Sequence, residues 1–289
     1  MPENKPAAHC RRARIATALL GVLLLSGVCV AQWQRGFGRG RRPVDRSEYP
    51  MWEVDREFRH NVFTFVRIQY DSRDSRGGYG WGRGGSRWGN DYPDSDWNFS
   101  YRLQELTSLE VDPDGRVLRL TNPEVFDYPF LYMNGVGRLQ FSDTEVVALR
   151  RYLLNGGFLM VDDFWGDREL SNIYEQFSRV IPDQHPRELP LSHEIFHLVY
   201  RLEEKPQVPS IRHWRAGRSF ENHGPGSEDG PHFLGIFDED GRLTVLLCHN
   251  NDIGDGWERE GDDPEYFLQC SEKLSYPMGI NIITYAMTH

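Results

Sequence analysis

Apolar and polar positions follow their clearest pattern between residues 142 and 166. Ser142 and Glu145 have the spacing of a capping box, in which the two side chains bind free backbone amides at the start of a helix. The apolar positions that follow recur at helical spacing: Val146, Leu149 and Leu153. The Gly156–Gly157 pair suits the left-handed turn that ends a helix, and 158–161 is an apolar run typical of a strand buried on both faces. This stretch therefore predicts a helix, a tight turn and a buried strand.

Strand patterns and helix patterns alternate along much of the remaining chain. Apolar and β-branched runs predict strands at 63–70, 117–120 and 128–135. Helices are expected from Asp94 or Ser95 to about Thr107, and from about Arg168 to Arg179. Such an alternation predicts an α/β fold with a mostly parallel sheet.

The pattern becomes less regular after Pro182. Residues 210–214 are a candidate strand, and 233–237 with 243–249 predict a β-hairpin around a glycine-containing turn. Residues 250–263 are polar and rich in glycine, which favours a loop. Helices are expected at 265–274 and 276–289, the second of them docked on the core.

The first 31 residues have the pattern of a signal peptide. Arg11, Arg12 and Arg14 form a basic segment, an apolar segment follows at 15–28, and small residues precede Ala31, after which we expect cleavage. The protein is therefore expected to be exported, to the periplasm or another part of the cell envelope. An uncleaved membrane anchor is the alternative, and it would keep the chain close to a membrane.

The rest of the chain divides into a linker and a folded domain. Residues 32–58 predict a flexible basic linker and 59–289 the α/β domain, in which the Gly- and Arg-rich segment 71–90 predicts a disordered insertion. Beyond the leader the chain contains Cys248 and Cys270, which either pair in an oxidising compartment or stay as two buried thiols. A net charge of −10 argues against a general affinity for nucleic acid.

Carboxylates gather where the predicted strands end. Asp162 and Asp163 follow the run 158–161, and ligands of parallel sheets bind beyond the carboxyl ends of the strands. At the same edge we expect further polar side chains from neighbouring loops: Asp91, Asp94, Asp96 and Asn134. His193 is expected to approach from its own loop, and Trp165 to line a ligand-binding cleft.

Two interpretations of these residues stay open. Clustered carboxylates with one imidazole suit a divalent metal ion such as Mg²⁺, Mn²⁺ or Ca²⁺, and they equally suit a protonated acid beside an ionised base. In the other interpretation the Asp residues cap helices, as they commonly do, and His193 binds a backbone carbonyl.

A zinc-protease signature is also present. His193-Glu194-x-x-His197 matches H-E-x-x-H, in which two imidazoles one helical turn apart bind zinc. Pro190 lies just upstream, the helical segment is short, and no convincing third ligand follows, so we favour a segment without metal.

Five stretches together resemble one bacterial family, the domain of unknown function 4159. They are Trp97–Leu103, Tyr128–Met133, Gly156–Asp163, Leu189–His193 and Tyr276–Ile282, and the resemblance covers roughly residues 60 to 289. The family is similar to the class I glutamine amidotransferases, which implies a flavodoxin-like three-layer α/β/α sandwich. Its members are associated with the cell envelope, and the resemblance implies no established reaction.

One departure from the amidotransferase pattern bears on chemistry. Those enzymes carry a nucleophilic Cys on the turn after the central strand, whereas Asp162-Asp163-Phe164-Trp165 fills it here. Acyl transfer from glutamine requires that thiol, so glutaminase activity is not expected. The sequence favours a non-catalytic binding or scaffolding module for envelope proteins or for a small-molecule or saccharide ligand. The alternative is a metal-assisted hydrolase of a carbohydrate or cell-wall substrate, and a zinc metalloprotease is less favoured.

Overall fold

A seven-stranded sheet organises the computed structural model, which describes residues 46–54, 61–73 and 87–289. The strands lie in the order β2-β1-β3-β4-β7-β6-β5. Their bounds are β1 Val66–Ile68, β2 Arg116–Leu118, β3 Phe130–Asn134, β4 Phe158–Phe164, β5 Arg187–Glu188, β6 His232–Phe237 and β7 Leu243–His249.

Most neighbouring strands run parallel. β1 pairs with β2 and β3, and β4 pairs with β3 and β7, all in parallel. β6 is antiparallel to both β7 and β5, which confirms the predicted hairpin. Because the chain proceeds from β1 outward to β2 and then returns to β3, the order reverses between β1 and β3. In open α/β sheets such a reversal opens the crevice where ligands bind.

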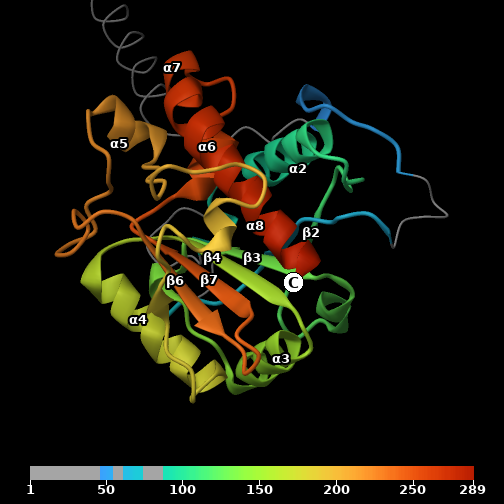
Figure 1. Ribbon diagram of the computed structural model, residues 1–289, viewed down its shortest axis with the longest axis vertical. Coiled ribbons are helices and arrows are strands. Elements are labelled where there is room, and N and C mark those ends of the chain that lie inside the picture. Colours follow the sequence, from blue (N-terminus) through green and yellow to red (C-terminus); the bar gives the residue numbers. More distant parts are fainter. Residues whose placement is uncertain (1–45, 55–60, 74–86) are drawn as a thin grey trace, which may run out of the picture. The chain divides into compact units, whose positions relative to one another are not determined.

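Helices cover both faces of this sheet (Figure 1). Their bounds are α2 Asp94–Leu106, α3 Asp143–Leu154, α4 Gly166–Val180, α5 Ile211–Arg215, α6 Ile253–Glu258, α7 Pro264–Tyr266, the π-helix Phe267–Ser275 and α8 Tyr276–Thr288. The helices α3 and α4 pack on one face, and α2, α6 and α8 on the other. The chain therefore has the predicted α/β fold in three layers.

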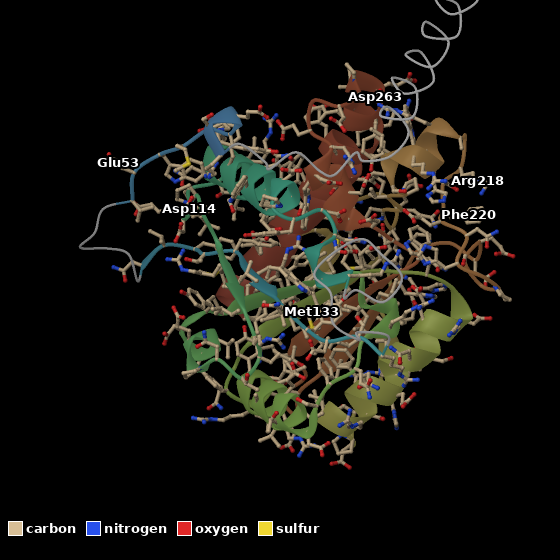
Figure 2. The ribbon with its side chains drawn as sticks, turned by 180° about the vertical axis from the view of Figure 1, so that it is seen from behind. Glu53, Asp114, Met133, Arg218, Phe220 and Asp263 are labelled. Carbon is tan, nitrogen blue, oxygen red and sulfur yellow. The ribbon has the colours of Figure 1, made fainter. Side chains whose placement is uncertain are left out.

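Successive side chains of a strand point to opposite faces of the sheet, and this produces two layers of hydrophobic core. Tyr132 and Met160 pack with α2, α6 and α8, whereas Leu131 and Val161 pack with α3 and α4. All four side chains are fully buried. Met133, labelled in Figure 2, belongs to the same layer as Leu131 and is also fully buried.

The helix before β4 begins as the sequence predicts. Ser142 accepts a hydrogen bond from the amide of Glu145 at 3.3 Å, and the Glu145 carboxylate accepts one from the amide of Ser142 at 2.9 Å. A cap of this kind stabilises a helix by about 1 kcal/mol. Gly156, at φ +94°, then turns the chain into β4.

Three segments differ from the predictions. β4 continues to Phe164, so Asp162 and Asp163 lie inside the strand instead of in the turn after it. Residues 211–215 form a helical turn, not a strand. The Ser210 carbonyl accepts hydrogen bonds from the amides of His213 and Trp214, as at the start of a helix. The expected loop after β7 contains α6, whose first turn is capped by Asp252.

The N-terminal predictions fall largely outside the described residues. This holds for the signal peptide, for most of the linker and for 74–86 of the predicted insertion. Residues 46–54, expected in the linker, contact the domain: the Tyr49 hydroxyl donates to Asp94 and the Trp52 indole donates to the Val111 carbonyl. In the part of the chain that is described, no helix combines the length and apolar character needed to cross a membrane.

Candidate functional site

The carboxyl ends of β3 and β4 meet the start of α6. Asn134, the last residue of β3, donates from Nδ2 to Asp91 Oδ2 at 2.8 Å. Asp162 Oδ2 on β4 accepts bonds from the Tyr132 hydroxyl at 3.1 Å and from the Gly254 amide at 2.9 Å. A Cβ on Gly254 would lie 2.6 Å from the Tyr132 hydroxyl and 2.8 Å from Asn134 Nδ2, so glycine lets α6 approach the strands this closely. The site therefore lies at the reversal point of the sheet.

Buried carboxylates dominate this region. Six of them are at most 8% exposed: Asp91, Asp162, Asp163, Asp252, Asp255 and Glu258. We call these six residues the carboxylate cluster.

Burial raises the pKa values of several members of the cluster. It raises the pKa of Asp91 well above its usual range, and the negative charges of Glu258 and Asp255 add to this effect. Burial also raises the pKa of Asp162 to about 7. The cluster is therefore costly to ionise unless a positive charge joins it.

Three members of the cluster have metal-ligand spacing. Asp91, Asp255 and Glu258 each present a carboxylate oxygen, and these oxygens lie within 4.8 Å of one another. The Arg259 guanidinium lies 2.6 Å from Glu258 Oε2 and 3.5 Å from Asp255 Oδ1. Oxygen ligands in such a group suit Mg²⁺, Ca²⁺ or Mn²⁺ better than zinc.

A buried ion pair fixes the loop that carries Asp91. Arg67, fully buried on β1, donates to the Asp96 carboxylate at 2.5 to 3.1 Å and to the backbone carbonyls of Trp88 and Asn90, both at 3.0 Å. Burial opposes the charge on Arg67, but the attraction of Asp96 outweighs it and the pKa of Arg67 is raised. Asp96 is therefore the ion-pair partner of Arg67. Through Arg67 it helps to hold the loop that carries Asp91.

Left-handed backbone conformations also gather here. Asp91, Asp163 and Asn250 have φ values of +60°, +52° and +55°, and no other non-glycine residue in the described ranges has a positive φ. Each such residue costs roughly 1–2 kcal/mol. Side-chain bonds hold all three: Asn134 donates to Asp91 at 2.8 Å, Asn90 donates to Asp163 at 2.9 Å, and Asn250 Oδ1 accepts from the Gly166 amide at 2.9 Å. Strain concentrated in this way is typical of functional sites.

A family profile described as a domain of unknown function, DUF4159, matches residues 64–287. The chain belongs to this family. Comparison with the curated proteins gives no match. The family assignment of this DUF4159 domain thus agrees with the resemblance seen in its sequence, and its chemistry has to be argued from the site.

The DUF4159 domain brings together only some of the predicted site residues. Asp91, Asn134, Asp162 and Asp163 meet at the carboxyl edge of the sheet, and Trp165, fully buried, donates from Nε1 to Asp163 Oδ1 at 3.3 Å. Asp94 lies at the start of α2, where it accepts a bond from Tyr49. Trp165 is thus a buried partner of Asp163.

His193 lies near the amino ends of β4 and β7, at the opposite end of the strands from Asp162 and Asp163. Its ring packs against Tyr285, which in turn contacts Phe158, the first residue of β4, and binds the amide of Leu243, the first residue of β7. His193 Nδ1 accepts a bond from the Ile195 amide and caps a short turn. The structure therefore does not bring His193 to Asp162 and Asp163, because the loop after β5 packs at the amino ends of the strands.

The zinc-signature segment does not form the long helix that the signature requires. Glu194–Phe196 is a single 3₁₀ turn, and His197 Nε2 bonds to the Leu191 carbonyl at 2.6 Å. The His193 imidazole bonds to the Ile195 amide and the His197 imidazole to the Leu191 carbonyl, so the pair does not have the arrangement that the zinc signature predicts.

Sequence reasoning missed half of the carboxylate cluster. Asp252, Asp255 and Glu258 recur every three residues, which places them near one face of α6. That spacing was the available signal, but two glycines within the segment favoured a loop.

A second polar network lies at the start of α4. His223 bonds to Glu169 through Nδ1 at 3.2 Å and lies 3.5 Å from Glu221 through Nε2. Burial opposes the charge on the imidazole, but the two carboxylates outweigh it and raise the pKa of His223 to about 10. His223 is therefore charged at neutral pH and ties the loop 221–227 to α4.

Replacing His223 by Gln should destabilise the domain by about 2 kcal/mol near pH 7, since both carboxylates lose a charged hydrogen-bond partner. An ordinary His has a pKa of about 6.5, so the stabilisation is complete below that pH and is lost as the pH rises through about 10. Urea unfolding at pH 6.5, 8 and 10 should show the gap between wild type and variant closing. His185→Gln, at an exposed position, is the control and should change little. An equal loss at every pH would assign His223 a packing role only.

Proposed function

We propose that this DUF4159 domain is an exported binding module of the cell envelope that takes up a cationic ligand at the carboxylate cluster. The observation that carries the proposal is the burial of six carboxylates at the reversal point of the sheet. Arg259 contacts Glu258, the charge of Arg67 acts on Asp91, and the charges of Arg87 and His223 act on Asp163. Arg67 and His223 are already paired with other carboxylates, so these cations offset only part of the negative charge. A bound cation would lower the cost of keeping the remaining carboxylates ionised.

The environment of the thiols argues against glutamine hydrolysis. Cys248 and Cys270 are free and buried. Burial raises the pKa of Cys248 well above its usual range, and the neighbouring charge of Asp162 adds to this effect. The pKa of Cys270 is likewise raised, to about 11, by burial and by Asp255. Both shifts disfavour the thiolate that acyl transfer needs, so we expect no ammonia release from glutamine.

Thermal unfolding of the full chain tests the binding proposal. Ca²⁺, Mg²⁺, Mn²⁺ and spermidine are added separately at constant ionic strength, with NaCl as the reference. A ligand at a hundred times its Kd stabilises the folded state by about 2.7 kcal/mol, so at least one of these cations should raise Tm by about 5–10 °C. An unchanged Tm with all four would contradict the proposal.

A metal-assisted hydrolase of a carbohydrate or cell-wall substrate is the second candidate. It is favoured by Asp162 Oδ1, which is fully buried beside the other carboxylates and makes no hydrogen bond within the described residues. A general base needs such a free oxygen. Release of reducing ends from purified peptidoglycan in the presence of Mn²⁺, lost in Asp162→Asn, would support this candidate over simple binding.

A further inference from the structure

We propose that the cationic ligand is a single hard divalent metal ion, held by Asp91, Asp255 and Glu258 with the side-chain carbonyl of Asn134. This inference rests on the proposed function and makes it more specific. The ligands come from the loop before α2, the end of β3 and the helix α6. The metal would therefore join three segments that are distant in the sequence.

The spacing of the three carboxylates fits one ion. Calcium binds oxygen ligands at about 2.3–2.6 Å, so two oxygens on opposite sides of the ion lie about 4.6–5.2 Å apart. The oxygens of Asp91, Asp255 and Glu258 all lie within 4.8 Å of one another. One ion placed between them can contact all three without movement of the backbone. Among the described residues, no other set of three His, Cys, Asp or Glu side chains meets this spacing.

Asn134 provides a second, independent indication of a ligand site. Its side chain is fully buried, and its Nδ2 donates to Asp91 Oδ2 at 2.8 Å and to the Tyr132 hydroxyl at 3.0 Å. Its Oδ1 has no hydrogen-bond partner within the described residues. Both atoms belong to one amide group, so the unpaired carbonyl oxygen lies next to an atom that contacts Asp91, one of the three proposed carboxylate ligands. A buried acceptor that is left unpaired destabilises the folded state, and a metal ion would satisfy it.

Other contacts hold the proposed ligands in place. Asp255 Oδ2 accepts bonds from the Ile211 amide at 2.7 Å and from the Tyr266 hydroxyl at 3.0 Å, which leaves Oδ1 for the ion. Tyr132 donates to Asp162 and accepts from Asn134, which fixes the amide beside Asp91. Such supporting bonds are a regular feature of metal sites.

Arg259 is the competitor of the metal. Its guanidinium lies 2.6 Å from Glu258 Oε2, and its side chain is 31% exposed, so it has room to leave when an ion binds. Arg259 thus supplies positive charge to the cluster from within the chain. Removing that cation should make metal binding tighter.

Isothermal titration calorimetry of the full chain, after dialysis against EDTA, tests the inference with CaCl₂, MgCl₂ and MnCl₂ in turn. We expect one ion per chain for at least one of these salts. Asp255→Asn and Glu258→Gln should each weaken the affinity at least tenfold, and Arg259→Gln should strengthen it at least threefold. Asp94→Asn removes the same charge three residues from Asp91, at a position bonded to Tyr49, and should leave the affinity within twofold of wild type.

Circular dichroism establishes which variants are folded, and two ligand variants are included so that one misfolded protein does not remove the test. Absence of binding heat from all three salts in the folded wild-type chain would overturn the inference. Unchanged affinity in a folded Glu258→Gln or Asp255→Asn protein would overturn it as well. Stabilisation by spermidine without metal binding would overturn the metal assignment and leave the proposed function intact. No response to any cation would overturn both.

Discussion

Replacing Arg67 by Met should destabilise the domain by about 3–5 kcal/mol, because the substitution leaves Asp96 charged and buried without its partner. Arg67 is fully buried, and the side chain of Asp96 is 5% exposed. Folded domains are typically stable by 5–15 kcal/mol, so this loss would remove a large part of the total. Urea unfolding monitored by circular dichroism measures it directly.

The Arg67 prediction has two internal controls. Arg73→Met breaks the ion pair with Glu175, whose side chains are 47% and 60% exposed, and should cost less than about 1 kcal/mol. The double variant Arg67→Met with Asp96→Asn should recover part of the loss, since no charge is then left buried alone. A cost for Arg67→Met as small as that of Arg73→Met would contradict the view that the buried ion pair with Asp96 stabilises the domain.

The same substitution should weaken cation binding. Arg67 also binds the carbonyls of Trp88 and Asn90, and these contacts hold the loop that places Asp91 beside Asn134. We therefore expect the folded fraction of the variant to bind its cation less tightly, although Arg67 itself is not a ligand.

The α/β architecture could be predicted from local patterns because each element carries its own signal. The capping box at Ser142, the glycine turn and the apolar run of β4 depend on residues close in sequence, and the structure confirms all three. The position of Asp162 and Asp163 at the carboxyl edge followed from the same pattern together with the parallel sheet. Local spacing was sufficient for these features.

Partnerships across the fold could not be predicted in this way. Arg67 is a charged residue inside an apolar strand, which signals an internal partner, but Asp96 becomes that partner only through the packing of α2 over β1. The edge of the sheet that His193 faces depends on the path of the loop after β5, which no short motif records. The helix α6 could not be predicted for a different reason. Its glycines lower helix propensity, and tertiary packing overrides that preference here.

Trp257→Ala should cost about 3–5 kcal/mol and lower Tm by about 10 °C, since it deletes a large side chain from the core beside the site. The Trp257 ring is 1% exposed and lies 4.3 Å from the Phe99 ring and 5.8 Å from the Tyr132 ring, measured between centroids. It therefore fastens α6 to α2 and β3. Because α6 carries Asp255 and Glu258, we expect cation affinity to fall together with stability.

Trp257→Phe is the matched control for this last substitution. Trp257 Nε1 makes no hydrogen bond within the described residues, so phenylalanine keeps most of the packing and removes an unsatisfied buried donor. We expect a cost below about 1.5 kcal/mol and nearly unchanged cation affinity. Calorimetric unfolding of both variants measures the effect of the ring on stability, and cation titration measures its effect on cation affinity. If Trp257→Ala lost stability but bound its cation with wild-type affinity, α6 would be held in place by other contacts, such as the bond from Ser275 to the Ile253 carbonyl at 2.6 Å.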